Sequence, residues 1–223
     1  SLDDSVETAL IFNTAVSEMD LLETILTEFG IRIRKDAKTK KAYIDALNKF
    51  LLKNYAAGKT AVILIDEAQN LSYGVLEQLR MLSNLETEQE KLLQIILIGQ
   101  PELKATLVQP ALRQLNERIT VRCSLQPLSP VEVASYIEHR LKVAQNPGWL
   151  KFTASAIRLI YRFSEGIPRR INALCDRALL IAYTKNTMKI NRRIVKLAAG
   201  DIGADYFQKT VNGWKRLWLR FSV

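Results

Sequence analysis

Hydrophobic residues follow two different patterns in the first half of the chain. Segments with an apolar residue at every third or fourth position predict amphipathic α-helices. The predicted helices are residues 17–29, 39–55 and 73–85. Continuous apolar runs rich in β-branched residues predict strands that are covered on both faces, as in a parallel sheet. The predicted strands are residues 8–12, 61–65 and 92–99, with residues 118–125 alternating like a fourth strand. Strands separated by helices indicate an α/β doubly wound sheet.

Polar residues and a glycine mark the ends of the first predicted helix. Ser17 is a typical helix N-cap, and Asp20 three residues later is an acidic partner for the N–H groups of the first turn. Gly30 is a natural stop, because glycine readily adopts the left-handed conformation that follows a last helical turn. We therefore expect the helix to begin after Ser17 and to end just before Gly30.

The pattern changes after Pro127. Four helices and no further convincing strand are expected, over residues 131–143, 153–163, 168–185 and 191–199. We therefore predict an α/β core in residues 1–127 and an all-helical lid domain in residues 128–201. Residues 202–223 form a third, basic and amphipathic segment.

The C-terminal segment combines aromatic and basic residues, and no acid follows Asp205. Its large apolar residues have helical spacing: Phe207, Val211, Trp214, Trp218 and Phe221. Aromatic rings beside lysine and arginine suit an anionic membrane surface, a partner that we assign to residues 206–223. The alternative is a C-terminal helix that packs on the lid domain.

Composition narrows the class of protein. The chain has 223 residues, 48% hydrophobic and 25% charged, which is ordinary for a soluble globular protein. No apolar run reaches the ~20 residues of a membrane span, and there is no secretory signal pattern at the start. With one histidine and two distant cysteines, Cys123 and Cys175, neither a zinc site nor a disulfide is expected.

The net charge of +9 has two interpretations. It favours an anionic partner such as nucleic acid or lipid. Alternatively, a nucleotide-binding protein carries basic residues for phosphate together with an ordinary basic surface.

A Gly-Lys-Thr tripeptide at residues 58–60 resembles the end of a phosphate-binding loop. Such a loop reads G-x-x-x-x-G-K-[ST] and joins a strand to a following helix. Here Lys53 stands where the first glycine belongs, and a helix precedes the tripeptide while a strand follows it. We therefore interpret residues 58–60 as a tight turn into the strand.

Asp66 and Glu67 are stronger candidates for a nucleotide site. They directly follow the predicted strand at residues 61–65, and α/β sheets bind ligands at the carboxyl ends of their strands. In a nucleoside triphosphatase the first acid holds Mg²⁺, usually through water, and the second orients or deprotonates the water that attacks the γ-phosphate. The alternative is that the pair caps the following helix.

Longer motifs surround this acid pair: DEAQNL, LEQLRMLSNLE, LLQIILIGQPEL, LRQLNERI, LQPLSPVEVASYIEHRL and GIPRRINALCDRALL. Together they extend over most of residues 8–200. The set resembles AAA+ ATPases of the general secretion pathway and MSHA pilus biogenesis type, the ExeA/GspA and MshM group. The resemblance implies a P-loop NTPase (AAA+) parallel sheet followed by a helical lid, with ATP and Mg²⁺ as cofactors.

The resemblance also implies roles in the α/β core. Asp66 corresponds to the Mg²⁺-associated acid, and Glu67 to the catalytic acid of the Walker B motif. Gln100, at the end of the next strand, corresponds to the sensor 1 residue that contacts the γ-phosphate or the water. The alternative for Gln100 is an ordinary turn residue.

Two arginines have implied roles. Arg118 corresponds to an arginine finger that reaches a neighbouring copy, since a guanidinium neutralises developing phosphate charge. Arg113 is the second choice, and a surface ion pair is the alternative. Arg169 matches the sensor 2 arginine of the lid; Arg170 beside it competes for this role, and a solvated helix start is the alternative.

The sequence departs from the family at the phosphate loop, which we do not find in it. We expect the sheet to lack its first strand and phosphate loop, so that residues 118–125 lose their neighbour and the inner edge of residues 92–99 is unpaired. We also expect an N-terminally truncated piece of a larger ATPase that by itself binds ATP weakly or not at all.

The expected function is ATP hydrolysis in support of a bacterial secretion or pilus system. The expected location is cytoplasmic, at the cytoplasmic face of the inner membrane. Secretion or pilus assembly proteins are the expected partners, with self-association through the Arg118 side. One alternative is a DNA-binding AAA+ regulator of the transposition type, less favoured because no helix-turn-helix is evident. The other is a non-enzymatic remnant that acts through protein contacts.

Overall fold

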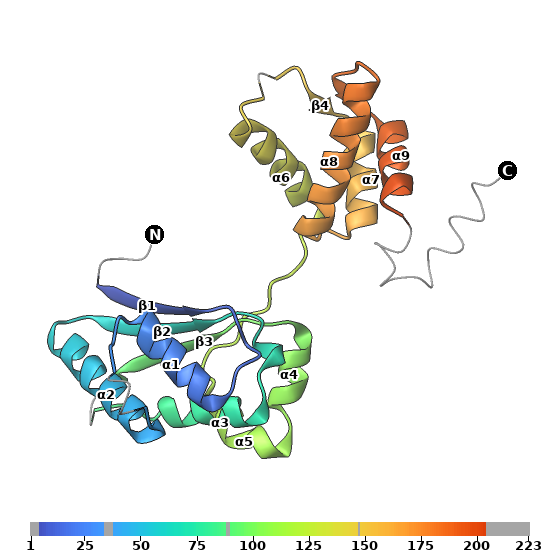
Figure 1. The fold of residues 1–223 in the computed structure, drawn as a ribbon. Coiled ribbons are helices and arrows are strands. Elements are labelled where there is room, and N and C mark those ends of the chain that lie inside the picture. Colours follow the sequence, from blue (N-terminus) through green and yellow to red (C-terminus); the bar gives the residue numbers. More distant parts are fainter. Residues whose placement is uncertain (1–4, 34–37, 88–89, 147, 204–223) are drawn as a thin grey trace. The chain divides into compact units, whose positions relative to one another are not determined.

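The computed structural model describes residues 5–33, 38–87, 90–146 and 148–203 (Figure 1). The chain divides into two compact units, called unit 1 (Ser1–Arg122) and unit 2 (Cys123–Val223) below. Each unit has its own hydrophobic core and is described by itself. The segment at residues 206–223, for which a membrane surface was predicted, lies outside the described residues.

Unit 1 alternates strands with helices. Its strands are β1 (Val6–Ile11), β2 (Thr60–Ile65) and β3 (Leu93–Leu97). Its α-helices are α1 (Glu18–Glu28), α2 (Lys40–Ala56), α3 (Tyr73–Leu82), α4 (Pro101–Leu107) and α5 (Arg113–Arg118), and two 3-10 turns are η2 (Ala68–Asn70) and η3 (Pro110–Leu112). The three helices and the first three strands predicted from the sequence are confirmed.

The three strands form a parallel sheet in the order β1-β2-β3. Ile65 is in register with Ile11 on one side and with Leu97 on the other, so the three strands end at one edge. Alternate strand residues, among them Ala9 and Ile63, are fully buried in a core shared with α1, α2 and α3. Figure 1 shows these helices on one face of the sheet.

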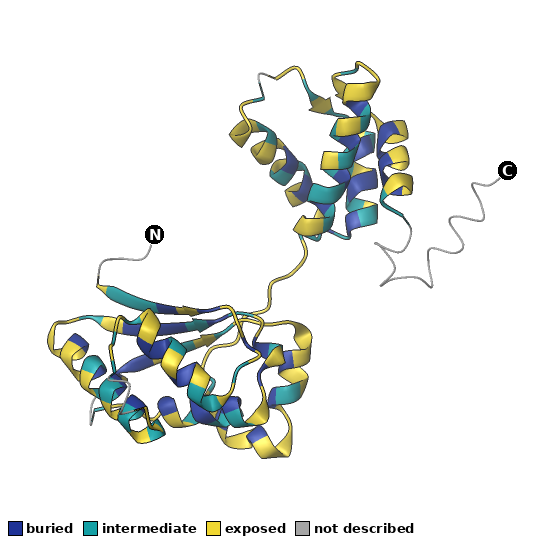
Figure 2. Ribbon diagram, in the orientation of Figure 1, coloured by how far each residue is buried: buried dark blue, intermediate teal, exposed yellow. Residues whose placement is uncertain are grey.

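The opposite face of the sheet is open within the described residues. Leu10 and Ile96 are 42% and 44% exposed, and Phe12 and Ile98 just beyond their strands are 71% and 46% exposed (Figure 2). The expectation that helices cover both faces is therefore wrong for the part of the chain that the structure describes.

The predicted strand at residues 118–125 is also wrong. Helix α5 ends at Arg118, and residues 119–129 adopt neither helix nor strand. Val121 and Leu125 are 81% and 94% exposed. An alternating pattern forms a strand only beside a partner. Among the described residues β3 pairs only with β2, so its other edge is unpaired, as expected, and offers no neighbour to this segment.

Unit 2 is a bundle of four α-helices: α6 (Pro130–Val143), α7 (Ala154–Ser164), α8 (Pro168–Thr184) and α9 (Arg192–Ile202). All four predicted helices are confirmed. The expectation of no further strand is wrong, because β4 (Lys151–Phe152) and β5 (Lys189–Ile190) pair in parallel. Strands of two residues are too short to leave a periodic signal in the sequence. Within the described ranges, no helix combines the length and hydropathy needed to cross a membrane.

Helix caps confirm the signals read from the sequence. The Ser17 hydroxyl accepts from the Asp20 N–H at 3.2 Å, and the Asp20 carboxylate accepts from the Ser17 N–H at 3.2 Å. The side-chain and backbone hydrogen bonds from Ser17 lower the pKa of Asp20. Gly30 adopts φ +70°, as predicted for the helix stop. In unit 2, Ser129 and Glu132 form an equivalent capping box at the start of α6.

The chain that enters α6 is anchored to the turn between α7 and α8. The Leu128 N–H donates to the Gly166 carbonyl at 2.9 Å. Gly166 has φ +77°, and a Cβ placed on it would lie 2.0 Å from the Leu128 carbonyl oxygen. Only glycine allows these two backbones to approach so closely. Gly166 thereby fixes the entry to α6 against the start of α8.

Candidate functional site

The carboxyl edge of the sheet is held together by backbone hydrogen bonds just beyond the strands. The Asp66 N–H donates to the Ile11 carbonyl at 3.0 Å, which joins the ends of β2 and β1. The Ala68 N–H donates to the Ile98 carbonyl at 2.9 Å, which joins the turn after β2 to the end of β3. Asp66 and Glu67 therefore lie at the rim where the three parallel strands end.

Glu67 adopts an unusual backbone conformation. Its φ is 51° and its ψ is 36°, in the left-handed region that non-glycine residues avoid at a cost of about 1 kcal/mol or more. The Asp66 carboxylate accepts from the Glu67 N–H at 2.8 Å, which holds this turn in place. The result is a sharp break between β2 and η2 that leaves the Glu67 side chain exposed.

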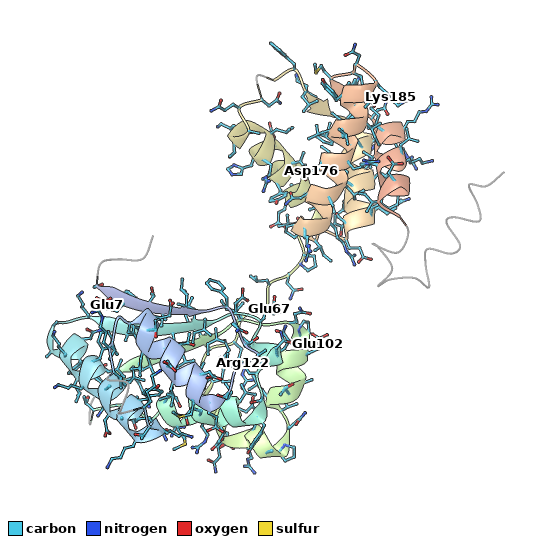
Figure 3. The ribbon with its side chains drawn as sticks, in the orientation of Figure 1. Glu7, Glu67, Glu102, Arg122, Asp176 and Lys185 are labelled. Atoms are coloured by element: carbon cyan, nitrogen blue, oxygen red, sulfur yellow. The ribbon has the colours of Figure 1, made fainter. Side chains whose placement is uncertain are left out.

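Two glutamine amides hold the Glu67 carboxylate (Figure 3 labels Glu67). The Gln69 Nε2 donates to Glu67 Oε2 at 2.6 Å, and the Gln100 Nε2 donates to the same oxygen at 3.3 Å. The Gln69 Oε1 accepts from the Gln100 backbone N–H at 3.0 Å. Gln69 thus bridges the carboxylate after β2 and the first residue of the turn after β3.

Gly99 makes this bridge sterically feasible. A Cβ at this position would lie 2.9 Å from Gln69 Oε1 and 3.0 Å from Leu103 Cδ2. A larger residue would displace the Gln69 amide from the backbone of Gln100. The sequence analysis paired Glu67 with Gln100 and missed Gln69. Its signal was an amide two residues after the second acid, in the turn that follows a buried strand.

The acid pair fits a magnesium ion better than a metal that needs a protein cage. One Asp66 oxygen accepts from the Glu67 N–H, and the other has no protein partner among the described residues. In the ranges that the structure describes, no group of three or more His, Cys, Asp or Glu could hold a metal ion. Mg²⁺ commonly binds through one or two carboxylates, with water and phosphate oxygens completing its shell. A Mg²⁺–nucleotide complex is therefore the ligand that these residues suit.

The Gly-Lys-Thr tripeptide lies at the opposite edge of the sheet. Gly58, at φ +70°, ends the turn after α2, and Thr60 begins β2. The Lys59 ammonium pairs with the Glu7 carboxylate at 2.6 Å, at the start of β1. A tripeptide at the amino end of the strands is far from the rim that holds Asp66, as its interpretation as a turn requires.

Arg118 and Arg113 differ in their partners. Arg113 forms an ion pair with Glu117 at 2.8 Å. Arg118, the last residue of α5, is exposed and has no ion pair among the described residues. It contributes, after the hydrogen bond and the charge of Lys91, to the lowered pKa of Glu86. The Arg118 guanidinium is therefore the freer of the two for an external anion.

Arg169 and Arg170 differ in the same way at the start of α8. Arg170 pairs with Glu165 at 3.0 Å, and its side chain is only 15% exposed. Arg169 is exposed and has no side-chain partner in the described part of unit 2. Unit 1 alone brings together Asp66, Glu67 and Gln100, whereas Arg169 belongs to the other unit.

Comparisons with known proteins agree with this architecture. Residues 2–107 match the family described as AAA domain. Unit 1 is an AAA domain. The chain is 48% identical over 203 residues to general secretion pathway protein A of Aeromonas hydrophila, which covers 90% of the chain and 36% of that protein. This AAA domain and the helical unit after it therefore correspond to about a third of that relative.

Two further proteins share parts of this chain. An uncharacterized HTH-type transcriptional regulator of Methanocaldococcus jannaschii is 30% identical over 157 residues, 69% of the chain and 38% of that protein. The Aeropyrum pernix ORC2 protein in its ADP form superposes with a TM-score of 0.63 at 16% identity, over 86% of the chain and 52% of that protein. The latter likeness concerns the fold: a P-loop type AAA+ parallel sheet followed by helices.

Proposed function

We propose that Asp66, Glu67, Gln69 and Gln100 form the acidic rim of an ATP-hydrolysing site. The observation that supports this most strongly is the Glu67 carboxylate, held by two amides at the carboxyl edge of a parallel sheet. In this proposal Asp66 accompanies Mg²⁺, which neutralises the phosphate charge when it is bound. Glu67 orients the water that attacks the γ-phosphate and accepts its proton.

Gln69 is a positioning residue in this proposal, because it acts through Glu67. Its amide fixes one carboxylate oxygen at 2.6 Å and leaves the other oxygen to face the water. Gln100 is proposed as the sensor that links the same carboxylate to the γ-phosphate. Loss of Gln69 should lower kcat more than it raises KM, since the Glu67 orientation is needed in the transition state.

The two free arginines complete the proposal. Arg118 of one copy is proposed to reach the nucleotide of a neighbouring copy, and Arg169 to bring α8 to the nucleotide. Both have no side-chain ion pair among the described residues, whereas Arg113 and Arg170 are each paired with a glutamate. Self-association through the Arg118 side is therefore part of the proposed mechanism.

The proposed biological role is support of a bacterial secretion system, by similarity to general secretion pathway protein A. Pilus assembly, and a location at the cytoplasmic face of the inner membrane, are proposed on the same basis. The 223 residues contain no G-x-x-x-x-G-K-[ST] motif. We therefore propose that this chain by itself binds ATP weakly, and that a complete site needs a phosphate loop from other residues.

The test is ATP turnover by the full-length natural protein that contains this chain. Glu67→Gln should reduce kcat by about 10²-fold or more while ATP binding persists, because it removes the base and keeps the amide-sized side chain. Glu102→Gln, an exposed carboxylate in the first turn of α4, is the matched control and should leave turnover unchanged. Equal turnover in Glu67→Gln and wild type would refute the role of Glu67.

A further inference from the structure

The positive charge of the chain is concentrated in the helical unit. Residues 1–122 contain 15 lysines and arginines against 17 aspartates and glutamates. Residues 123–203 contain 13 against five. The proposed nucleotide site in unit 1 therefore does not account for the basic character of the protein.

Within unit 2, two stretches contain no acidic residue at all. They are residues 139–164 and 177–200, which together carry eleven lysines and arginines. The two stretches meet where β4 pairs with β5, and this pairing places Lys151 opposite Lys189. The fold therefore brings the basic parts of two separate segments to one end of the bundle.

We call this end of unit 2 the basic end, defined by Lys151, Lys185, Lys189, Arg192 and Arg193. Lys185 follows the last residue of α8, and Figure 3 shows it at the end of that helix. Arg192 and Arg193 form the first turn of α9, directly after β5. All five side chains are exposed.

The cations of the basic end are not neutralised within the described part of unit 2. Elsewhere in the unit, Arg170 pairs with Glu165 and Arg177 with Asp201, whereas no carboxylate pairs with the five residues of the basic end. Two arginines in the first turn of α9 also oppose the positive end of the helix dipole. This arrangement does not favour the stability of the unit, which points to an external anion.

Exposed aromatic residues lie beside these cations in the sequence and on the same elements. Trp149 is 73% exposed and precedes Lys151 by two residues. Tyr183 is 82% exposed and precedes Lys185 by two residues. Rings of this kind stack on unpaired bases, and neighbouring cations contact phosphates.

We propose that the basic end of unit 2 binds single-stranded nucleic acid. The alternation of a ring with a cation suits a polymer in which bases alternate with phosphates. A lipid surface would instead favour a continuous apolar wedge. At the basic end each exposed ring has a lysine two residues away, so the surface offers no uninterrupted apolar area of that kind.

The test is fluorescence anisotropy of the 223-residue chain with a labelled oligo-dT or oligo-U, at salt concentrations between about 50 and 200 mM. Affinity should fall steeply with salt. The double variant Lys151→Glu/Lys189→Glu should bind at least about tenfold more weakly and reduce the salt slope by about 2, because each lost phosphate contact removes close to one counterion. Trp149→Ala should weaken binding and leave the salt slope unchanged.

The matched control is Lys49→Glu/Lys53→Glu, the same change of charge on exposed positions of α2 in unit 1. It should bind within about twofold of wild type, since long-range effects of charge are screened over roughly 10 Å. Equal losses in the two double variants would overturn the proposal. Binding to phosphatidylglycerol vesicles without binding to either oligonucleotide would overturn it in favour of a membrane.

Discussion

Replacement of Gly166 by alanine tests the anchor between the entry to α6 and the turn before α8. The substitution places a Cβ 2.0 Å from the Leu128 carbonyl oxygen, where no atom can remain. It also forces alanine into φ +77°, which costs about 1–2 kcal/mol. One backbone must move, and the hydrogen bond from Leu128 to Gly166, worth about 1 kcal/mol, is lost. The expected loss of stability is about 2–4 kcal/mol.

The chain supplies a matched control for this prediction. Gly200 lies within α9, and a Cβ placed on it meets nothing within 4 Å. Gly200→Ala should therefore stabilise unit 2 by up to about 1 kcal/mol, because alanine favours the helix. The two substitutions add the same methyl group and are expected to act with opposite signs.

The assay is urea unfolding of both variants, followed by far-UV circular dichroism. A shift of the midpoint at constant slope gives the change in the free energy of unfolding. Gly166→Ala should unfold at lower urea than wild type, and Gly200→Ala at equal or higher urea. If Gly166→Ala unfolds within about 0.5 kcal/mol of wild type, the contact with Leu128 does not constrain unit 2, and the reasoning fails.

Three further predictions concern single side chains. Burial raises the pKa of the Cys175 thiol to about 12, so alkylation at pH 8, read by mass spectrometry, should modify exposed Cys123 quickly and Cys175 only after unfolding. Ser129→Ala should cost about 1 kcal/mol in urea unfolding, through loss of the α6 cap. Hydrogen bonds from Ser129 lower the pKa of Glu132, so its contribution should be complete above pH 4.5 and decline as the pH falls through the lower folded value; Glu132→Gln should flatten that part of the pH profile. The buried Gln78 amide has no hydrogen-bond partner among the described residues, so Gln78→Leu should raise the urea midpoint, by up to about 1–3 kcal/mol. A lower midpoint would show that the amide is satisfied in solution.

Local signals in the sequence were sufficient for most of the fold. Ser17 and Gly30 mark helix ends through interactions within a few residues, so their effect is visible in a short window. The strand at residues 61–65 was recognised because a buried central strand is apolar throughout. The segment at residues 118–125 shows the limit of this approach, since a strand also depends on a neighbour that the pattern does not contain.

The candidate site was predictable only in part. Asp66 and Glu67 directly follow a strand, and Gln100 ends the turn after the next one, so sheet topology alone places them together. Gln69 was missed because its role depends on a side-chain conformation and on the absence of a Cβ at Gly99. The basic end was hidden for a similar reason: Lys151 and Lys189 are 38 positions apart and meet only through β4 and β5.

The left-handed backbone at Glu67 separates two kinds of selection at this position. Asparagine occupies that conformation with less strain than glutamate, and glycine does so with none. A library screened only for the amount of folded protein should therefore tolerate or enrich these smaller residues at position 67. A library screened for nucleotide turnover should reject them. Comparison of the two screens would reveal how far the protein sacrifices foldability to keep a carboxylate at this turn.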